Sequence, residues 1–461
     1  MAIQKTISPV DGSVYVEREQ ADLGLVEATL ARAVTAQRAW RDVPLSERAR
    51  YCSRMVDAFV ACRDALAEEL TWQMGRPIAA AAGEIGGFEE RARTMIALAD
   101  GALAPIVLED KPGFTRYITR EPLGVSFIVA PWNFPFMTAV NAVVPAIMAG
   151  NAVILKHSAQ TPLCAERFQQ AFDEAGLPEG VFQHLHLSHE ATEDLIQDRR
   201  IAHVSFTGSV PGGAMVERNA AGRFIATGLE LGGKDPAYIR PDVDLDAAVD
   251  GVMDGAFFNS GQSCCGIERL YVHRDIFDAF VERAVAWVRQ LRLGNPTDPA
   301  TSLGPLVRPA AADFVRGQIE EAVAAGARAW IDPGDYPLSV PGSAYLAPQV
   351  LTGVDHSMRV MTEESFGPVV GIMAVDSDDE AVALMNDSDF GLTAAVFTRD
   401  RAIGEALTRR LDAGTVFTNR CDYLDPELAW TGVKQSGRGC SLSRLGYETL
   451  TRPKSFHLKH A

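Results

Sequence analysis

Apolar residues recur along the chain at the intervals of amphipathic helices. Residues 21–40 carry them every three or four positions, so this segment is predicted to be a helix. A second helical stretch is predicted over 46–74, because Ser46 is a suitable N-cap and Gly75-Arg76-Pro77 a suitable stop. The same pattern predicts further helices at 137–149, 162–175, 211–221, 244–259, 276–291 and 310–325.

Short apolar runs between these segments predict strands. They lie at 114–120, 124–130, 152–156, 201–206, 223–230, 268–273, 348–351, 368–374, 394–397 and 414–418, with another in the tail at 454–461. From about residue 124 strands and helices alternate, which favours parallel sheets with helices on both faces. The sequence therefore predicts an α/β fold, with a second α/β domain in the second half of the chain.

Composition narrows the class of protein. The 461 residues suggest two or three domains, and 47% hydrophobic with 22% charged residues is ordinary for a globular chain. A net charge of −17 argues against binding to nucleic acid or to an anionic membrane surface. The seven cysteines form no CxxC pair, so neither a zinc site nor a disulfide framework is expected. Without a signal-like N-terminus or a membrane span, a cytoplasmic protein is predicted.

Two motifs contain candidate reactive groups. Cys264 lies in Gly261-Gln262-Ser263-Cys264-Cys265, a loop after a predicted helix, where a thiolate could act as a nucleophile. Alternatively, it is a small buried hydrophobe, as most cysteines are. Glu230 ends an apolar strand before two glycines, where a carboxylate can act as a general base or simply be solvated.

Three further motifs suggest binding groups. Asn133, between two prolines in Pro131–Pro135, offers an amide donor for an oxyanion, although turns also favour asparagine. Thr207-Gly208-Ser209 joins a strand to a helix N-terminus, which can bind a pyrophosphate although the pattern is not GxGxxG. Lys156 ends a strand and could reach a ribose or a phosphate, or lie on the surface.

Taken together in this order, the motifs resemble the aldehyde dehydrogenase superfamily over essentially the whole chain. The similarity extends from Ser8-Pro9 to the Gly432–Gly437 segment and includes the Glu364-Ser365-Phe366-Gly367-Pro368 motif. The spacing from Glu230 to Cys264 is also typical of that family. Chain length and Leu155-Lys156-His157 are most similar to bacterial semialdehyde-type members.

The resemblance implies a role for each catalytic candidate. Cys264 matches the nucleophile, Cys265 the neighbouring position that does not react, and Glu230 the general base. Asn133 matches the oxyanion donor that acts with the backbone N–H of Cys264. The implied reaction is oxidation of an aldehyde through a thiohemiacetal and a thioester to a carboxylic acid. The presence of Glu230 favours hydrolysis of the thioester over transfer to coenzyme A.

The resemblance also implies a nicotinamide cofactor, NAD or NADP. In relatives that prefer NAD a glutamate follows the cofactor lysine by three positions, and here that position is Ala159. The sequence therefore predicts that NADP is tolerated beside NAD, the alternative being that NAD stays preferred. The matching cofactor positions are Ile128, Ala130, Trp132, Lys156, Ser158, Ala159, Gly180, Gly208, Ser209, Leu231, Glu364 and Phe366.

The positions that match the family's substrate tunnel are mostly apolar or aromatic. Relatives that take succinate semialdehyde carry arginines where this chain has Asn141 and Phe258. An apolar or aromatic aldehyde is therefore predicted, with succinate semialdehyde as the alternative. In that alternative Arg420 would anchor the carboxylate; otherwise it forms a rim salt bridge with Asp422 or Asp425. The predicted tunnel residues are Phe134, Asn141, Phe258, Tyr423, Leu424 and Trp430.

The family's architecture implies three parts. A Rossmann-like cofactor domain would comprise 1–107 and 123–232, and a catalytic domain 233–437. Segments 108–122 and 438–461 would form a small sheet that pairs with another subunit, so a homodimer or homotetramer is expected. Two other functions stay open: a thiol esterase that needs no cofactor, and a binding protein on an inactivated scaffold, which would be expected to lose Cys264, Glu230 or Asn133.

Overall fold

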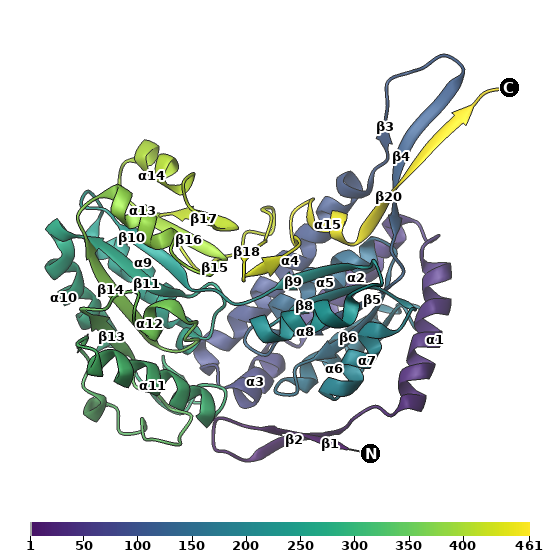
Figure 1. Cartoon of the computed structure of the whole chain (residues 1–461). Helices are drawn as coiled ribbons and strands as arrows, with labels where there is room; N and C mark the ends of the chain where they lie inside the picture. Colours follow the sequence, from purple (N-terminus) through teal and green to yellow (C-terminus); the bar gives the residue numbers. More distant parts are fainter. Residues whose placement is uncertain (1) are drawn as a thin grey trace.

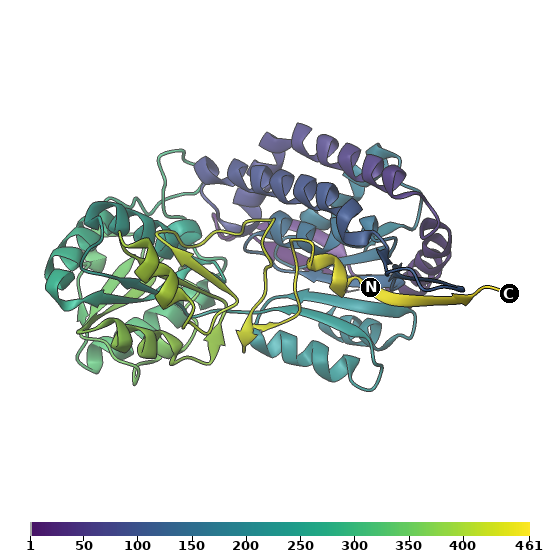
Figure 2. The ribbon, with the colours of Figure 1, turned by 90° about the horizontal axis from the view of Figure 1, so that it is seen from above.

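The computed structural model describes residues 2–461, which form two lobes with a narrow arm projecting from one of them (Figures 1 and 2). Each lobe is built on a sheet that is almost entirely parallel, with helices against both faces. This confirms the predicted α/β fold. Within the described residues, no helix combines the length and apolar character needed to cross a bilayer.

The first lobe contains a six-stranded sheet. Its strands are β5 (Val125–Ala130), β6 (Ala152–His157), β7 (Phe182–His184), β8 (Ile201–Thr207), β9 (Ala226–Glu230) and β19 (Gly437–Arg438). Their order is β19-β9-β8-β5-β6-β7, and only β19 runs antiparallel to its neighbour. The carboxyl ends of β5, β6, β8 and β9 therefore lie on one edge, where ligands bind in such folds.

The period-two alternation of side chains on a strand explains the two helical layers of this lobe. On β5, Phe127 and Val129 pack with the apolar cluster of one face, whereas Ile128 and Ala130 pack with that of the other. The first face is covered by α1 (Leu23–Trp40), α7 (His189–Gln197) and α8 (Val210–Ala220). The second is covered by α2 (Leu45–Ala61), α3 (Arg63–Met74), α4 (Ile78–Leu103), α5 (Pro135–Met148) and α6 (Pro162–Ala175).

The second lobe contains a seven-stranded sheet in the order β12-β13-β14-β11-β10-β16-β17. The strands are β10 (Asp235–Ile239), β11 (Ile267–His273), β12 (Arg328–Ala329), β13 (Gln349–Thr352), β14 (Val369–Val375), β16 (Thr393–Phe397) and β17 (Thr415–Thr418). Only β12 is antiparallel to its neighbour. The helices are α9 (Leu245–Phe257), α10 (Phe277–Val288), α11 (Pro309–Ala324), α12 (Arg359–Thr362), α13 (Asp378–Asn386) and α14 (Arg401–Thr408).

A three-stranded antiparallel sheet forms the arm that leaves the first lobe (Figure 1). It consists of β3 (Ile106–Val107), β4 (Phe114–Pro122) and β20 (Thr451–Lys459), the last preceded by the short helix α15 (Gly446–Thr449). Two small antiparallel pairs complete the fold. They are β1 (Ile3–Ile7) with β2 (Val14–Glu19), and β15 (Phe390–Gly391) with β18 (Val433–Lys434).

Two predicted helices have different bounds in the structure. The stretch predicted over 46–74 is two helices, because the chain leaves helical geometry at Cys62 with φ −97° and ψ 13°. The helix predicted over 244–259 ends at Phe257, because Asn259 and Ser260 adopt left-handed conformations. Both deviations depend on tertiary contacts that periodicity does not contain.

Candidate active site

Cys264 follows a sharp turn at the end of α9. Asn259 and Ser260 have φ values of 52° and 57°, and a Cβ on Gly261 would lie 2.2 Å from the carbonyl oxygen of Gly367. Only glycine fits where these two segments cross. The turn carries the chain to Cys264, which is partly exposed and lines two cavities, a tunnel and a second pocket.

The neighbouring thiol is directed elsewhere. Cys265 is buried, and its Sγ donates to Oδ1 of Asp422 at 3.1 Å. The hydroxyl of Ser263 donates to the same oxygen at 2.8 Å. The thiol of Cys264 and burial raise the pKa of the Cys265 thiol well above its usual range. Both cysteines line the tunnel, but only Cys264 of the two also lines the second pocket, and Cys265 is held by Asp422.

Asn133 lies beside the Cys264 loop. Its side-chain amide donates to the carbonyl oxygen of Gln262 at 3.2 Å, and its own carbonyl oxygen accepts from Asn259 at 3.2 Å. Arg76 donates to that carbonyl oxygen as well. These bonds tie the Asn133 loop to the turn before Cys264, so an amide donor is held close to the nucleophile.

A buried ion pair supports this arrangement from the helical layer. Arg76 and Glu84 are both buried and joined through Nη1 and Oε2, and Arg76 also donates to Asn259 at 3.1 Å. Glu84 Oε1 accepts from the backbone N–H of Phe136 at 2.8 Å, at the N-terminus of α5. One pair thus fixes both the helix that follows Asn133 and the turn that precedes Cys264.

Glu230 ends β9 and lines both cavities beside Cys264. Its Oε2 accepts from the hydroxyl of Thr207 at 3.0 Å, and its Oε1 accepts from the hydroxyl of Ser441. Burial raises the pKa of Glu230, and the two hydroxyl groups and Arg91 oppose that rise. A carboxyl group with a raised pKa suits a general base near neutral pH.

The tunnel encloses about 280 Å³ and contains all six residues predicted for it. Phe134 and Phe258 stack with ring centroids 6.3 Å apart across it. Arg91 and Asp254, which the sequence did not single out, also line it, as does Asp422, which was named only as a salt-bridge partner of Arg420. The predicted lining residues are Phe134, Asn141, Phe258, Tyr423, Leu424 and Trp430.

The second pocket holds about 210 Å³ on the other side of Cys264. It contains six of the predicted cofactor residues and the N-terminus of α8, where Ser209 Oγ accepts from the Gly212 N–H. A Cβ on Gly232 would lie 2.3 Å from Glu364 Oε2, so glycine leaves room for this carboxyl group. A helix N-terminus beside a carboxylate fits a pyrophosphate and a ribose. The six residues are Trp132, Gly208, Ser209, Leu231, Glu364 and Phe366.

Comparison with known proteins agrees with this geometry. The model of the aldehyde dehydrogenase family matches residues 2–456. The chain belongs to the aldehyde dehydrogenase family.

Relatives within the family carry semialdehyde names. A succinate-semialdehyde dehydrogenase (NADP+) of Mycobacterium tuberculosis is 39% identical over 446 residues, which cover 96% of each chain. One from Mycolicibacterium paratuberculosis is 37% identical and covers 98% of this chain and 95% of its own. The crystal structure of succinic semialdehyde dehydrogenase from Streptococcus pyogenes with NADP+ has a TM-score of 0.94 at 29% identity, covering 99% of this chain and all of its own.

In this aldehyde dehydrogenase the loop with Glu364 and Phe366 rests on a buried charge pair. Lys234 and Glu268 are buried and in contact, and Glu268 accepts from the N–H groups of Ser365 and Phe366 at 2.8 Å each. Burial and Glu268 raise the pKa of Glu364 to about 8. The dehydrogenase therefore presents a carboxyl group that accepts a hydrogen bond from the N–H of Gly233 inside the second pocket.

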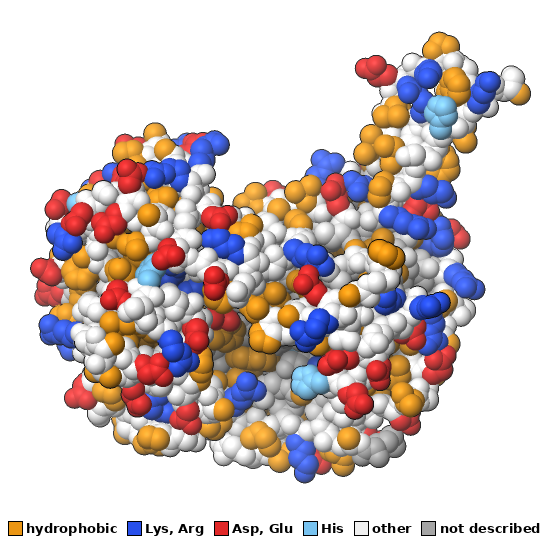
Figure 3. Space-filling model, in the orientation of Figure 1, with side chains coloured by type: hydrophobic (Ala, Val, Ile, Leu, Met, Phe, Trp, Pro, Cys, Tyr) orange, Lys and Arg blue, Asp and Glu red, His pale blue; other side chains and the backbone are white. Residues whose placement is uncertain are grey.

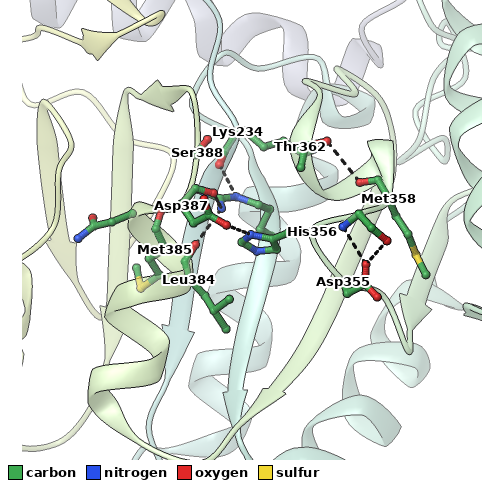
Figure 4. A network of polar contacts seen from close by, with 12 residues as sticks. Lys234, Asp355, His356, Met358, Thr362, Leu384, Met385, Asp387 and Ser388 are labelled. Carbon is green, nitrogen blue, oxygen red and sulfur yellow. Dashed lines mark hydrogen bonds and ion pairs between the residues drawn. The ribbon is translucent and has the colours of Figure 1, made fainter.

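A polar network fixes the chain just before this loop (Figure 4). His356 Nδ1 lies 2.6 Å from Oδ2 of Asp387, and its Nε2 lies 2.8 Å from the hydroxyl of Tyr271. Asp355 accepts from the N–H of Ser357 at 2.8 Å. These contacts join the segment after β13 to the end of α13, so the approach to Glu364 is held from two sides.

The remaining predicted cofactor residues lie outside the second pocket. Lys156 is the last residue but one of β6, is buried, and its Nζ donates no hydrogen bond within residues 2–461. Ser158 and the exposed Ala159 follow after His157, and the Ala159 carbonyl oxygen accepts from the Thr6 hydroxyl at 2.9 Å. Ile128 and Ala130 line a small cavity behind Glu230.

Gly180 also lies outside the second pocket. It lies beside α1, where a Cβ would be 3.0 Å from the Ala36 side chain and from the Arg32 carbonyl oxygen. Its surface cavity is lined by residues such as Gln183, and it shares no residue with the second pocket. Close packing on a helix is one reason for the glycine, and its role as a cofactor contact stays a prediction.

Sequence reasoning missed the polar residues of α4. Glu84, Phe88, Arg91 and Met95 fall on one buried face of this helix. The signal was available, because two charged residues stand within an apolar stripe at helical spacing. Charged side chains on a buried face are rare unless they are paired or functional.

Proposed function

We propose that this protein oxidises an aldehyde to the carboxylic acid with NADP or NAD as hydride acceptor. One observation carries the proposal. Cys264 and Glu230 line both the tunnel and the second pocket, so a nucleophile and a base stand where two different ligands would meet. This arrangement supports a reaction between an aldehyde in the tunnel and a nicotinamide in the second pocket.

The first half of the reaction belongs to Cys264 and Asn133. The Cys264 thiolate adds to the aldehyde carbon to give a thiohemiacetal, and the Asn133 amide stabilises the oxygen that becomes negative. A nicotinamide held in the second pocket beside Phe366 and Glu364 would supply the hydride acceptor, and loss of hydride from this carbon leaves a thioester on Cys264. The tunnel and the fixed loops keep the reacting groups in place during this step.

The second half belongs to Glu230. Its carboxylate takes a proton from a water molecule, which attacks the thioester carbon. The C–S bond breaks, the carboxylic acid leaves and the Cys264 thiolate is restored. The hydroxyl groups of Thr207 and Ser441 hold the carboxylate beside Cys264 for this purpose.

The residues expected near the adenosine half of the cofactor favour NADP over NAD. Lys156 supplies an ammonium group without a hydrogen-bond acceptor among the described residues, and Ala159 brings no carboxylate that would repel a 2′-phosphate. The relatives named for NADP+ support the same preference.

Two substrate classes have support. The stacked Phe134 and Phe258, with Trp430, favour an apolar or aromatic aldehyde. The names of the relatives favour succinate semialdehyde. Arg420 offers no carboxylate anchor inside the tunnel, because it is exposed and stacks 3.5 Å over the Tyr423 ring rather than pairing with Asp422 or Asp425.

The decisive experiment measures formation of reduced nicotinamide from benzaldehyde, phenylacetaldehyde, hexanal and succinate semialdehyde, with NADP and NAD in parallel. We expect turnover with NADP that Cys264→Ala abolishes and Cys265→Ser retains, because only Cys264 faces the cofactor pocket. Turnover that survives Cys264→Ala would contradict the assignment of the nucleophile. Hydrolysis of esters without any nicotinamide oxidation would favour the thiol esterase instead.

A further inference from the structure

Arg91 is a buried cation in the tunnel without a carboxylate partner. It comes from α4, is 7% exposed, and lines the tunnel together with Cys264. Its Nη1 donates to the Met137 carbonyl oxygen at 2.9 Å and to Asn141 Oδ1 at 3.4 Å. Within residues 2–461, neither its Nε nor its Nη2 donates a hydrogen bond, and no carboxylate forms an ion pair with it.

This situation differs from that of the other buried arginines. Arg76, on the same side of the sheet, pairs with Glu84, and Arg269 donates to several backbone carbonyl oxygens. Burial lowers the pKa of Arg91, and the charges of Cys265 and Glu230 oppose this shift without forming an ion pair with it, while the arginine remains charged. An uncompensated buried charge is costly, so a group that completes it is expected to come from outside the chain.

A second donor points to the same place. Asn141 is 2% exposed and lines the tunnel, and its Nδ2 is a buried donor without an acceptor in the described part of the chain. Its Oδ1 accepts from Arg91, which fixes the orientation of the amide. Two neighbouring side chains of α4 and α5 therefore offer unused N–H groups and no unused acceptor between them. A planar anion with two oxygens, such as a carboxylate, satisfies such a set.

We propose that Arg91 and Asn141 form an anion-binding subsite of the tunnel, and that the substrate is an aldehyde with a carboxylate at its far end. The inference rests on the proposed function, since it names the substrate class of the same tunnel. The stacked aromatic side chains then cover the apolar middle of the substrate, while the charged end reaches the guanidinium.

The carboxylates of the tunnel do not offer a cationic aldehyde a comparable binding site. Asp422 accepts from Ser263 and Cys265. Glu90 accepts from the Tyr423 hydroxyl at 3.2 Å and is exposed, as is Asp254 at the tunnel rim. Glu230 is held by Thr207 and Ser441 and is needed as the base. Only the Arg91–Asn141 pair is both buried and incomplete.

The test compares kcat/KM for succinate semialdehyde, pentanal and 4-aminobutanal in the wild type, Arg91→Met and Arg91→Lys. We expect the wild type to prefer succinate semialdehyde. Arg91→Met should lower kcat/KM for it by about 100-fold, as the loss of a charge-assisted bidentate contact implies, and change that for pentanal less than fivefold. Arg91→Lys should retain part of the preference, because the charge remains but the fork is lost.

Arg93→Met is the matched control. Arg93 lies two positions after Arg91 on α4, but it is exposed and paired with Asp57 and Glu89. It should leave kcat/KM unchanged for all three substrates. If Arg91→Met lowers kcat/KM equally for succinate semialdehyde and pentanal, Arg91 serves the chemistry of Cys264 rather than specificity, and the proposal is overturned. A wild-type preference for 4-aminobutanal or pentanal would overturn it as well.

Binding of succinate separates this proposal from the proposed function. Succinate at millimolar concentration should raise the melting temperature of the wild type but not of Arg91→Met, and this readout needs no turnover. A protein that oxidises no aldehyde but shows the Arg91-dependent shift would refute the dehydrogenase function and keep the anion subsite. Turnover of aldehydes with no such shift would refute the subsite alone.

Discussion

Two opposing influences set the proton affinity of Glu230. Burial raises the pKa of this carboxyl group, and the hydroxyl groups of Ser441 and Thr207 lower it by donating to the charged form. The base is active when deprotonated, so kcat should rise as pH increases through that pKa. The two hydroxyl groups therefore extend activity toward lower pH.

Ser441→Ala removes one of these donors. The pKa of Glu230 should rise further, so the ascending limb of kcat against pH should move to higher pH by about one unit. One charge-assisted hydrogen bond contributes roughly the free energy that corresponds to this shift. Activity at alkaline pH should recover to near the wild-type value. A limb that stays in place would show that Ser441 does not influence the base.

Ala159 offers a test of cofactor selection. This residue is exposed, and it follows Lys156 by the spacing at which NAD-preferring relatives carry a glutamate. Ala159→Glu should lower kcat/KM for NADP by at least tenfold and leave NAD nearly unchanged, because a carboxylate would repel the 2′-phosphate and not the ribose hydroxyl. Equal losses with both cofactors, measured at saturating aldehyde, would contradict this assignment.

At this scale the sequence predicted groups whose motifs are local. Cys264, Glu230 and Asn133 come from separate motifs, and the structure brings them together, although their roles stay predictions. Arg91 was not predicted, because its meaning depends on burial against Asn141 on another helix. The contact of Gly180 with α1 could not be predicted either, because it joins two segments that are distant in the sequence.

Among the elements, α4 connects both halves of the site. Its Glu84 pairs with Arg76 and caps α5, and its Arg91 lines the tunnel. Replacing Glu84 by alanine leaves Arg76 as a buried unpaired charge and removes a backbone acceptor.

Glu84→Ala should therefore lower the free energy of unfolding by about 3–5 kcal/mol, as expected when one partner of a buried pair is removed. It should also reduce kcat, because Arg76 and the start of α5 hold Asn133. Chemical denaturation and steady-state rates check both effects. Glu89→Ala, which removes an exposed partner of Arg93 on the same helix, should cost under about 1 kcal/mol.

Element prediction succeeded where periodicity was strong and local. The strands β5, β6 and β8 and the helices α5 and α6 lie close to their predicted ranges. Helix α4 was missed, because the charged residues Glu84 and Arg91 interrupt its apolar stripe. β7 was missed because it has only three residues, and β10 because a proline stands inside it.

At the scale of the whole molecule, both lobes contribute residues to the active site. Figure 3 shows a hollow between them with apolar side chains at its base. The first sheet supplies Glu230 from β9, and the loop before the second sheet's β11 supplies Cys264. We propose a division at 232/233, between β9 and β10. The predicted boundary at 437/438 falls within β19, which pairs with β9 of the first lobe, and β3, predicted for the cofactor domain, pairs with β4 of the arm.

The arm bears on the expected oligomer. The arm projects from the first lobe (Figure 1). On it Ile106, Val107 and Leu108 are 49%, 79% and 42% exposed, and Leu458 is 48% exposed. An exposed apolar edge favours contact with another subunit. We therefore expect a homodimer or homotetramer in which this edge is covered.

Val107→Asp tests this arrangement in solution. The side chain is exposed in the single chain, so the variant should fold normally, but a carboxylate buried in a subunit contact would be costly. Light scattering after size exclusion should show the mass falling from the wild-type oligomer to a monomer. Val340→Asp, which makes the same change at an exposed valine in the second lobe, should keep the wild-type mass. If both variants remain oligomeric, the arm is not the contact that holds the subunits together, and the exposed edge needs another explanation.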